Sequence, residues 1–415
     1  MSASDPLALS LLVLLSAASV LATAVTHACV HLKLRRRRHP DSGPTPPISV
    51  LKPLKGTDDE LFENLRSIAE QDYPGPFEIV LAAADPDDAA LTVAQRLRRA
   101  CPEVSVRVVP GCHGPGLNPK VANLRALEGA ARYPYLLVSD SNVRVGPSYL
   151  RQTAAALADA RVGLVTNVLA GVGEHSLGAA LENIHLNGFV AGAVCGAELL
   201  ARHPCVVGKS MLMSRAALAR VGGFAAVQDV LGEDYLLGTA MKRAGYRVVL
   251  SPHVIYTVNR HWSVSRFGSR HLRWSQMRRW IAPRAYVFEP LLNPTPWLLL
   301  LALLVCTGHA PARLPAGAWL ALALGGVGLK VASDAWLSQR LRGSLPRGWA
   351  AACIPVKDVV VLGLWGIAWL RRVVQWRGNR MRIGPGSALL PLRRDGRFWS
   401  GDIVAGSEEP VDEAA

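Results

Sequence analysis

The sequence predicts an α/β domain with a mainly parallel sheet, to which membrane helices are attached at both ends. Of its 415 residues 50% are hydrophobic, and the mean hydropathy is +0.21, so a purely soluble protein is not expected. Between residues 48 and 143, short apolar runs alternate with amphipathic runs, which indicates strands alternating with helices. Long, nearly uncharged runs lie on either side of this region.

The alternating region sets the direction of the strands. A strand, a helix and a second strand form a parallel pair, because the helix returns the chain to the edge at which it started. We expect strands at 48–54, 77–85, 104–110 and 135–143, and helices at 58–71 and 90–101. Ligands of such sheets bind beyond the carboxyl ends of the strands. Asp85, Asp87 and Asp140 stand at those ends.

An apolar run near the N-terminus predicts a membrane anchor over residues 1–34. The run from 7 to 32 is long enough to cross a bilayer. A signal peptide would carry basic residues before the run, whereas here Asp5 precedes it and four arginines at 35–38 follow it. The positive-inside rule therefore places the next segment, a basic and Pro-rich linker at 35–47, in the cytosol.

The C-terminal part of the chain is membrane-like again. Runs at 289–308 and 316–337 predict two spans, and a shorter run at 354–370 predicts a re-entrant or interfacial helix. Together they form a membrane region at 289–372. Residues 373–415 are basic and then acidic, and we expect them to be a cytosolic tail that anchors at the membrane surface.

The charge of the chain limits its partners. A net charge of +15 fits either a nucleic acid or an anionic membrane surface. The basic residues cluster at the edges of apolar runs, and no DNA-binding motif is present, so we expect a lipid bilayer and no nucleic acid. The seven cysteines are scattered without a C-x-x-C pair, which argues against a disulfide framework and fits a reducing cytosol.

Two clusters of acids follow predicted strands, ADPDD at 84–88 and SDSNV at 139–143. A nucleoside diphosphate needs a divalent cation across its phosphates, and such cations take carboxylate oxygens. The same residue types also begin turns, so either cluster alone leaves both interpretations open. Glu233 and Asp234 open a predicted helix, where the helix dipole stabilises an acid whether or not it takes a proton from a substrate.

A helix expected at 263–282 carries Arg270, Arg273 and Trp274 in an R-x-x-R-W pattern. Positions three and four apart share one face of a helix. An apolar stripe flanked by arginines is typical of an interfacial helix among lipid headgroups. The same helix suits an active site in which the tryptophan shapes an acceptor pocket and arginine holds a diphosphate. The two interpretations are compatible.

These segments resemble a known group of enzymes. The order Asp85, Asp140 and Asp234, followed by R-x-x-R-W, resembles the D, D, D, (Q/R)-x-x-R-W signature of membrane-bound family-2-like glycosyltransferases. Further stretches resemble ceramide glucosyltransferases and the related hopanoid-associated bacterial glycosyltransferases: SVLKPLKG at 49–56, NPKVANL at 118–124, GKSMLMSR at 208–215 and GEDYLLGTAM at 232–241. The resemblance runs from residue 48 to residue 289 and includes the helices at both ends.

The resemblance implies a Rossmann-like domain of the glycosyltransferase A type at 48–288, on the cytosolic face of the membrane. The donor would be a UDP-sugar, with UDP-glucose expected, bound with Mg²⁺ or Mn²⁺, and the acceptor a membrane lipid such as ceramide. Asp234 would be the general base of an inverting transfer, and Glu233 would orient or cap. The remaining roles implied are Asp140 at the cation, Asp85 or Asp87 with Lys120, Asn123 and Cys205 near the donor, Arg270 or Arg273 on the diphosphate, and Trp274 at the acceptor.

Asn142 departs from the pattern of the family. Many relatives that bind a metal carry Asp two places after the residue matching Asp140, so a cation held by this turn alone is less expected. The alternatives are a hopanoid or another lipid as acceptor with UDP-N-acetylglucosamine as donor, a polysaccharide synthase, and an inactive membrane scaffold. Polysaccharide synthases usually carry Gln where Arg270 stands. The low ratio of Lys to Arg and the abundant Ala suggest a GC-rich bacterium, and hence its inner membrane.

Overall fold

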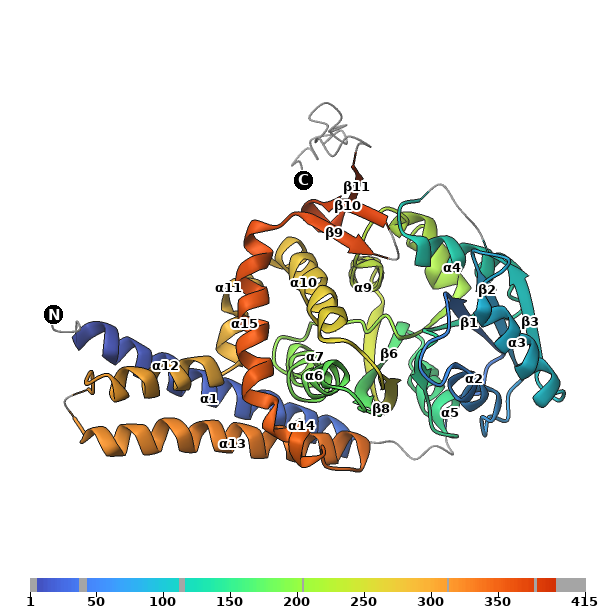
Figure 1. Ribbon diagram of the computed structural model, residues 1–415. Helices are drawn as coiled ribbons and strands as arrows, with labels where there is room; N and C mark the ends of the chain where they lie inside the picture. Colours follow the sequence, from blue (N-terminus) through green and yellow to red (C-terminus); the bar gives the residue numbers. More distant parts are fainter. Residues whose placement is uncertain are drawn as a thin grey trace.

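The computed structural model describes residues 6–36, 43–111, 116–203, 205–311, 313–376 and 379–392. It has two parts, an α/β domain and a bundle of long helices that projects from one side of it (Figure 1). The C-terminal segment returns from the helices and covers one end of the α/β domain. The N-terminal helix is thus part of the bundle, and the C-terminal segment packs on the α/β domain.

The central sheet has eight strands in the order β3-β2-β1-β4-β7-β6-β8-β5. The strands are β1 (Ile48–Leu54), β2 (Phe77–Ala83), β3 (Ser105–Pro110), β4 (Tyr135–Ser139), β5 (Val143–Arg144), β6 (Val162–Val172), β7 (Ser210–Ser214) and β8 (Arg247–Val258). Neighbours from β3 to β4 are parallel, β6 is parallel to β8, and β7 runs antiparallel between β4 and β6. The predicted mainly parallel sheet is confirmed.

The predicted strand at 135–143 is two strands with a turn between them. β4 ends at Ser139, the main-chain nitrogen of Val143 donates to the oxygen of Asp140 at 3.3 Å, and β5 then pairs with β8. Asp and Asn favour such turns because their short side chains hydrogen-bond the local backbone. The acid at position 140 therefore lies at the edge of the sheet rather than within a strand.

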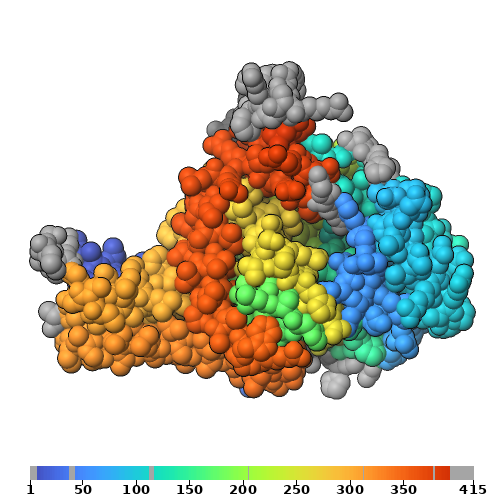
Figure 2. Space-filling model, in the orientation of Figure 1, coloured from blue at the N-terminus to red at the C-terminus, as the bar shows by residue number. Residues whose placement is uncertain are grey.

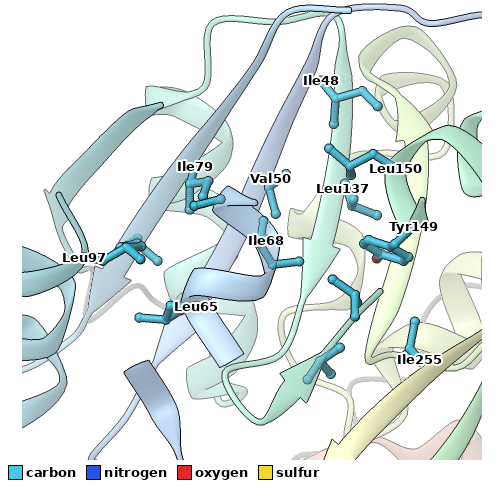
Figure 3. Close-up of a cluster of buried hydrophobic side chains, with 14 of the residues drawn as sticks. Ile48, Val50, Leu65, Ile68, Ile79, Leu97, Leu137, Tyr149, Leu150 and Ile255 are labelled. Carbon is cyan, nitrogen blue, oxygen red and sulfur yellow. The ribbon is translucent and has the colours of Figure 1, made fainter. Parts of the chain in front are cut away.

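Helices cover both faces of the sheet. In β1, Ile48, Val50 and Leu54 enter one apolar cluster and Leu51 enters the other, as expected from the two-residue repeat of a strand. Figure 3 shows the first cluster, where strand side chains meet those of α2. The helices of the domain are α2 (Leu61–Ala69), α3 (Ala89–Ala100), α4 (Pro119–Ala130), α5 (Tyr149–Ala154), α6 (Leu177–His185), α7 (Ala191–Leu199), α8 (Arg215–Arg220), α9 (Glu233–Arg243) and α10 (Val264–Ile281).

Among the described residues, two helices are long and apolar enough to cross a membrane, α1 (Pro6–Arg35) and α13 (Ala316–Arg342). The predicted span at 289–308 is not one straight helix. The segment Pro283–Leu292, which holds α11 (Pro283–Phe288), is bent by 54° against α12 (Thr295–Cys306). Proline lacks the backbone N–H that continues a helix, and Pro294 stands at the break. This pair is either one broken span or a re-entrant loop.

The last helix, α15 (Ile354–Leu370), follows the short α14 (Gly348–Ala352) and runs across the direction of α13 (Figure 1). It lies beside α10, where Arg279 donates to the main-chain oxygens of Ala368 and Trp369 at 2.8 Å. An interfacial position for 354–370, one of the two topologies expected, agrees with this direction. The interfacial position stays a prediction.

The segment after α15 is folded, which differs from the expected tail. Three strands, β9 (Val373–Trp376), β10 (Asn379–Ile383) and β11 (Leu389–Pro391), form a small antiparallel sheet. Its inner side chains pack against Leu231 and, on α10, against Met277 and Trp280. The acidic end of the predicted tail lies outside the described residues.

Candidate active site

The centre of the site is the turn after β4. Lys52 on the neighbouring β1 is fully buried, and its ammonium donates to the main-chain oxygen of Asp140 at 2.9 Å. The Ser141 hydroxyl donates to the Asp58 carboxylate at 2.5 Å. Because β1 and β4 are parallel neighbours, their carboxyl ends lie at the same edge of the sheet. The Asp140 carboxylate is thus held at that edge.

Lys120 connects this turn to the acids of α9. Asn118 caps α4 by accepting from the main-chain nitrogen of Lys120 at 2.9 Å, which fixes the first turn of the helix. The Lys120 ammonium then lies 3.0 Å from Asp140 Oδ1 and 3.0 Å from Glu233 Oε1. Burial lowers the pKa of Lys120, but Asp140 and Glu233 outweigh burial and raise it. One ammonium therefore joins carboxylates far apart in the sequence.

Asp234 lies on the same side of this arrangement. Its oxygens accept from the main-chain nitrogens of Gly208 and Tyr235, both at 2.8 Å, and the Gly208 oxygen accepts from Lys120 at 3.0 Å. Burial, reinforced by the charge of Glu233, raises the pKa of Asp234 to about 6. A Cβ at position 208 would stand 2.6 Å from Asp234 Oδ2, so only glycine permits this approach. Asp140 and Asp234 therefore lie in one site, as predicted, and Lys120 and Gly208 connect them.

Lys209 is the third lysine of the site, and sequence reasoning missed it. Residue 209 precedes β7, whose first residue pairs with the last residue of β4. Its ammonium donates to Asn142 Oδ1 at 2.7 Å and lies 3.4 Å from Asp140 Oδ2. Burial lowers the pKa of Lys209 to about 8 and that of Lys52 to about 7. The sequence did contain a signal for both residues, a lysine inside or beside an apolar strand. A buried ammonium needs an anionic partner, so such a lysine indicates an ion pair or a bound anion.

The R-x-x-R-W helix, α10, brings Arg270 and Trp274 to the site. The Arg270 guanidinium lies over the Trp274 ring, 4.5 Å from its centroid, and 3.2 Å from the buried Glu182 carboxylate. His271 contacts the same carboxylate at 2.7 Å. Burial is the main cause that lowers the pKa of Lys209, and the charge of Arg270 adds to it. Figure 2 shows α10 in yellow on the surface between the C-terminal segment and the N-terminal strands and helices.

Three other predicted site residues, Cys205, Asn123 and Arg273, lie around these acids and lysines in different surroundings. Cys205 is close enough to Asp234 for that charge, together with the larger effect of burial, to raise the pKa of its thiol to about 11. Asn123 is buried on α4, and its side-chain oxygen has no hydrogen-bond partner among the described residues. Arg273 points to the C-terminal sheet, donating to the Gln375 oxygen at 3.4 Å.

Asp85 and Asp87 lie at the expected edge of the sheet but outside the network of Asp140. Both are exposed after β2, and the Asp85 carboxylate accepts from the main-chain nitrogen of Asp87 at 2.9 Å. The neighbouring Asp88 caps α3 and also accepts from the main-chain nitrogen of Gly56. Their positions suit contact with an outer part of a ligand, and their role stays a prediction.

The C-terminal sheet holds the loop that leads to Glu233 and Asp234. Leu231 donates to the main-chain oxygen of Ser387 at 2.9 Å, and Gly232 donates to the Ser387 hydroxyl at 3.2 Å. Ser387 is fully buried and has a φ of 62°, a left-handed conformation that is uncommon for a residue other than glycine. The sheet also packs against α10 and Leu117, so it joins three parts of the site.

A divalent cation can be tested against the side chains of this edge. Among the described residues, no three His, Cys, Asp or Glu side chains gather as a metal-binding group. However, Asp140 Oδ2 and Asn142 Oδ1 both face one position, at which the Lys209 ammonium lies. Mg²⁺ in nucleotide sites is commonly held by one or two protein oxygens together with phosphates and water. The two oxygens fit such a cation, provided that a nucleotide completes its shell.

A family model and individual relatives of this chain agree with each other. The sequence model of glycosyl transferase family 21 matches residues 11–389. Ceramide glucosyltransferase 3 of Caenorhabditis elegans is 30% identical over 258 residues, covering 62% of this chain and 56% of that enzyme. Ceramide glucosyltransferase 1 of the same organism is 29% identical over 266 residues, covering 62% and 55%. The chain thus spans little more than half the length of these relatives.

A solved structure is also similar to this chain, at lower sequence identity. Mannosyltransferase PcManGT from Pyrobaculum calidifontis, in complex with GDP-Man and Mn²⁺, has a TM-score of 0.48 and 21% identity, covering 83% of this chain and 99% of that chain. The resemblance predicted from the sequence motifs is confirmed by the family match, which includes the sheet, α10 and most of the C-terminal sheet.

Proposed function

Because the chain belongs to glycosyl transferase family 21, we propose that it transfers a hexose from a UDP-sugar, expected to be UDP-glucose, to a hydroxyl group of a membrane lipid such as ceramide. The observation that carries the proposal is the Lys120 bridge, which brings Asp140, Glu233 and Asp234 together beside α10. An acid with a pKa near 6 next to buried cations suits a reaction that removes one proton and releases an anion.

The donor diphosphate finds compensating charge at the edge of the sheet. Lys52, Lys120 and Lys209 are all buried there, with Arg270 nearby. Nearby carboxylates offset part of this charge, and a diphosphate would give the ammonium groups further anionic partners. Asp140 and Asn142 would hold a Mg²⁺ or Mn²⁺ ion between protein and phosphates. When bound, that cation supplies charge neutralisation for the departing UDP.

In the proposed transfer, Asp234 accepts the proton of the lipid hydroxyl. The lipid oxygen attacks the anomeric carbon from the face opposite UDP, the bond from that carbon to the phosphate oxygen breaks, and its electron pair leaves with UDP. The configuration at the anomeric carbon is inverted. Lys209 and Arg270 stabilise the charge that develops on the diphosphate. A positioned base of this kind contributes typically about 10²–10⁴-fold to the rate.

The acceptor explains the membrane helices. Removing a lipid chain from the bilayer costs about 0.8 kcal/mol per CH₂, so the enzyme meets the hydroxyl at the membrane surface. In the part of the chain that the structure describes, α1 and α13 are long and apolar enough to hold it there, and α10 lies between α15 and the central sheet (Figure 1). Basic residues in the last turns of α1 and α13 favour the cytosolic side, and we propose the inner membrane of a bacterium as its location.

The proposed function is tested with radiolabelled sugar donors. Membranes containing the protein are incubated with UDP-glucose or UDP-N-acetylglucosamine, and the label is followed into the lipid extract, into polymer and into water-soluble products. We expect label from UDP-glucose in a ceramide-type lipid. Label in polymer, or none above membranes lacking the protein, contradicts the proposal. Label from UDP-N-acetylglucosamine in a hopanoid contradicts the donor and acceptor proposed here.

The hydroxyl of Ser387 gives a more specific prediction. Ser387→Ala removes the acceptor for the Gly232 nitrogen, so the loop before Asp234 is less well positioned. We expect kcat to fall about fivefold, equivalent to roughly 1 kcal/mol, with little change in KM for the donor. Steady-state kinetics check this.

Ser387→Gly separates the hydroxyl from the backbone conformation. Glycine tolerates the left-handed conformation at position 387 but also lacks the hydroxyl. It should therefore show the same loss of kcat as Ser387→Ala. Wild-type kcat in either variant would contradict a positioning role for the hydroxyl.

A further inference from the structure

We propose that the Lys209 ammonium holds the divalent-cation position of the donor-free protein, and that it gives up the Asp140 and Asn142 oxygens to the cation when the donor diphosphate arrives. This inference rests on the proposed function, since it assigns a binding order to the donor of that same site. Lys209 would control the binding of the divalent cation without being one of its ligands.

The geometry of the turn is the first argument. Two oxygens from one turn, Asn142 Oδ1 at 2.7 Å and Asp140 Oδ2 at 3.4 Å, point at the same ammonium. Asn142 and Lys209 are each 8% exposed, whereas the Asp140 side chain is 27% exposed, so the position can be reached from the open side of the turn. Oxygens that converge on one point can hold a cation, and in the donor-free protein that cation is the Lys209 ammonium.

The charges around the turn supply the second argument. The other Asp140 oxygen is already 3.0 Å from Lys120, and the Asp140 main-chain oxygen accepts from Lys52. A divalent ion added to the donor-free protein would therefore meet the Lys120 and Lys209 ammonium groups on the two oxygens of the Asp140 carboxylate. Like charges a few ångströms apart repel each other strongly where burial limits screening by water. The cation alone should bind poorly.

The third argument is where the displaced ammonium can go. Lys209 stands before the first residue of β7, on a long flexible side chain, and the charge of Arg270 acts on it. Arg270 is the guanidinium that we assign to the diphosphate. When the Lys209 ammonium leaves Asp140, the phosphates of the donor become its new anionic partner. The divalent cation that arrives with the donor then binds the Asp140 and Asn142 oxygens. Binding of cation and nucleotide should then be strongly coupled.

The test measures Mn²⁺ binding by electron paramagnetic resonance on the purified full chain in detergent, with and without UDP. For the wild type we expect weak Mn²⁺ binding alone and at least tenfold tighter binding with UDP. Lys209→Met should bind Mn²⁺ at least tenfold more tightly than wild type without UDP, and UDP should add little. It should also bind UDP more weakly when EDTA removes the cation.

Two matched variants make the result specific. Lys52→Met removes another buried ammonium, which contacts the main-chain oxygen of Asp140 rather than its carboxylate. Lys242→Met removes an exposed one on α9. Both should change Mn²⁺ binding less than Lys209→Met. Mn²⁺ affinity of Lys209→Met within twofold of wild type, or an equal gain in Lys52→Met, would overturn the inference.

The outcome can be told apart from that of the proposed function. If wild type transfers sugar to lipid but Lys209→Met shows unchanged Mn²⁺ binding, the exchange is wrong and the function stands. If Mn²⁺ binding changes as expected but the wild type labels no lipid, the exchange stands and the function is wrong.

Discussion

Replacing Asp234 with Asn is expected to lower kcat for sugar transfer by about 10²–10⁴-fold, since the lipid hydroxyl loses its proton acceptor. The effect should fall on kcat more than on the KM of the donor, because Asp234 is bound by Gly208 and Tyr235 rather than facing the lysines directly. Transfer assays over a range of UDP-glucose concentrations measure both constants. Wild-type kcat in Asp234→Asn would rule out this base.

The pH dependence follows from the raised pKa of Asp234, about 6. The base form appears as the pH rises through that value, so wild-type transfer should increase from pH 5 to pH 7 and then level. The residual rate of Asp234→Asn should lack this rise. Asp72→Asn is a suitable control, since that carboxylate is exposed and pairs with Arg151 at the surface.

Protein stability provides a check that is independent of catalysis. A carboxyl group whose pKa is raised by folding stabilises the fold in its protonated form, and that contribution is lost as the pH rises through about 6. The melting temperature of the wild type should therefore decrease more between pH 4 and pH 7 than that of Asp234→Asn. An equal decrease in both proteins would argue against the raised pKa.

Lys120→Met is expected to abolish transfer and to lower the free energy of unfolding by about 3–5 kcal/mol, the usual loss when one partner of a buried ion pair is removed. The reason is that Asp140 and Glu233 share this ammonium and would face each other without it. Thermal unfolding in detergent, followed by tryptophan fluorescence, measures the loss. Lys242→Met makes the same chemical change on the surface and should leave the melting temperature unchanged.

A second substitution tests whether Lys120 acts through charge. In Lys120→Met with Glu233→Gln, one of the two uncompensated carboxylates is gone, so part of the lost stability should return. If the double variant is no more stable than Lys120→Met alone, the destabilisation comes from packing of the side chain rather than from the ion pairs.

Much of the central sheet could be predicted because its signals are local. Ile48–Leu54 and Phe77–Ala83 are short apolar runs, each followed by an amphipathic helix, and they form the strands expected. Asp140 could be placed at the edge of the sheet for the same reason, since parallel strands bring their carboxyl ends together. Asp234 lies in the first turn of α9, and only the resemblance to the family's motif order placed it in the same site. Their bridge through Lys120 was not predictable, because it depends on the side-chain geometry of three separate segments.

The C-terminal sheet shows what local signals miss. Its strands are three to five residues long, and the sequence at 371–382 that holds the first two is rich in arginine, so the composition indicates a membrane-surface tail. A sheet this small is marginally stable alone. Its inward side chains, such as Val374 and Ile383, become buried only against Leu231 and α10. The fold of this segment is therefore set by tertiary contacts that no sequence window contains.

The position of Ser387 late in the chain has a consequence for biosynthesis. A ribosome makes residues 229–234 long before residue 387, so the segment carrying the base emerges without the partner that holds it. Until translation passes β11, the nascent polypeptide contains Asp140, Glu233 and Asp234 without the contact that positions the loop before them. Under the proposed function, competence for transfer would be acquired only after Ser387 has been made.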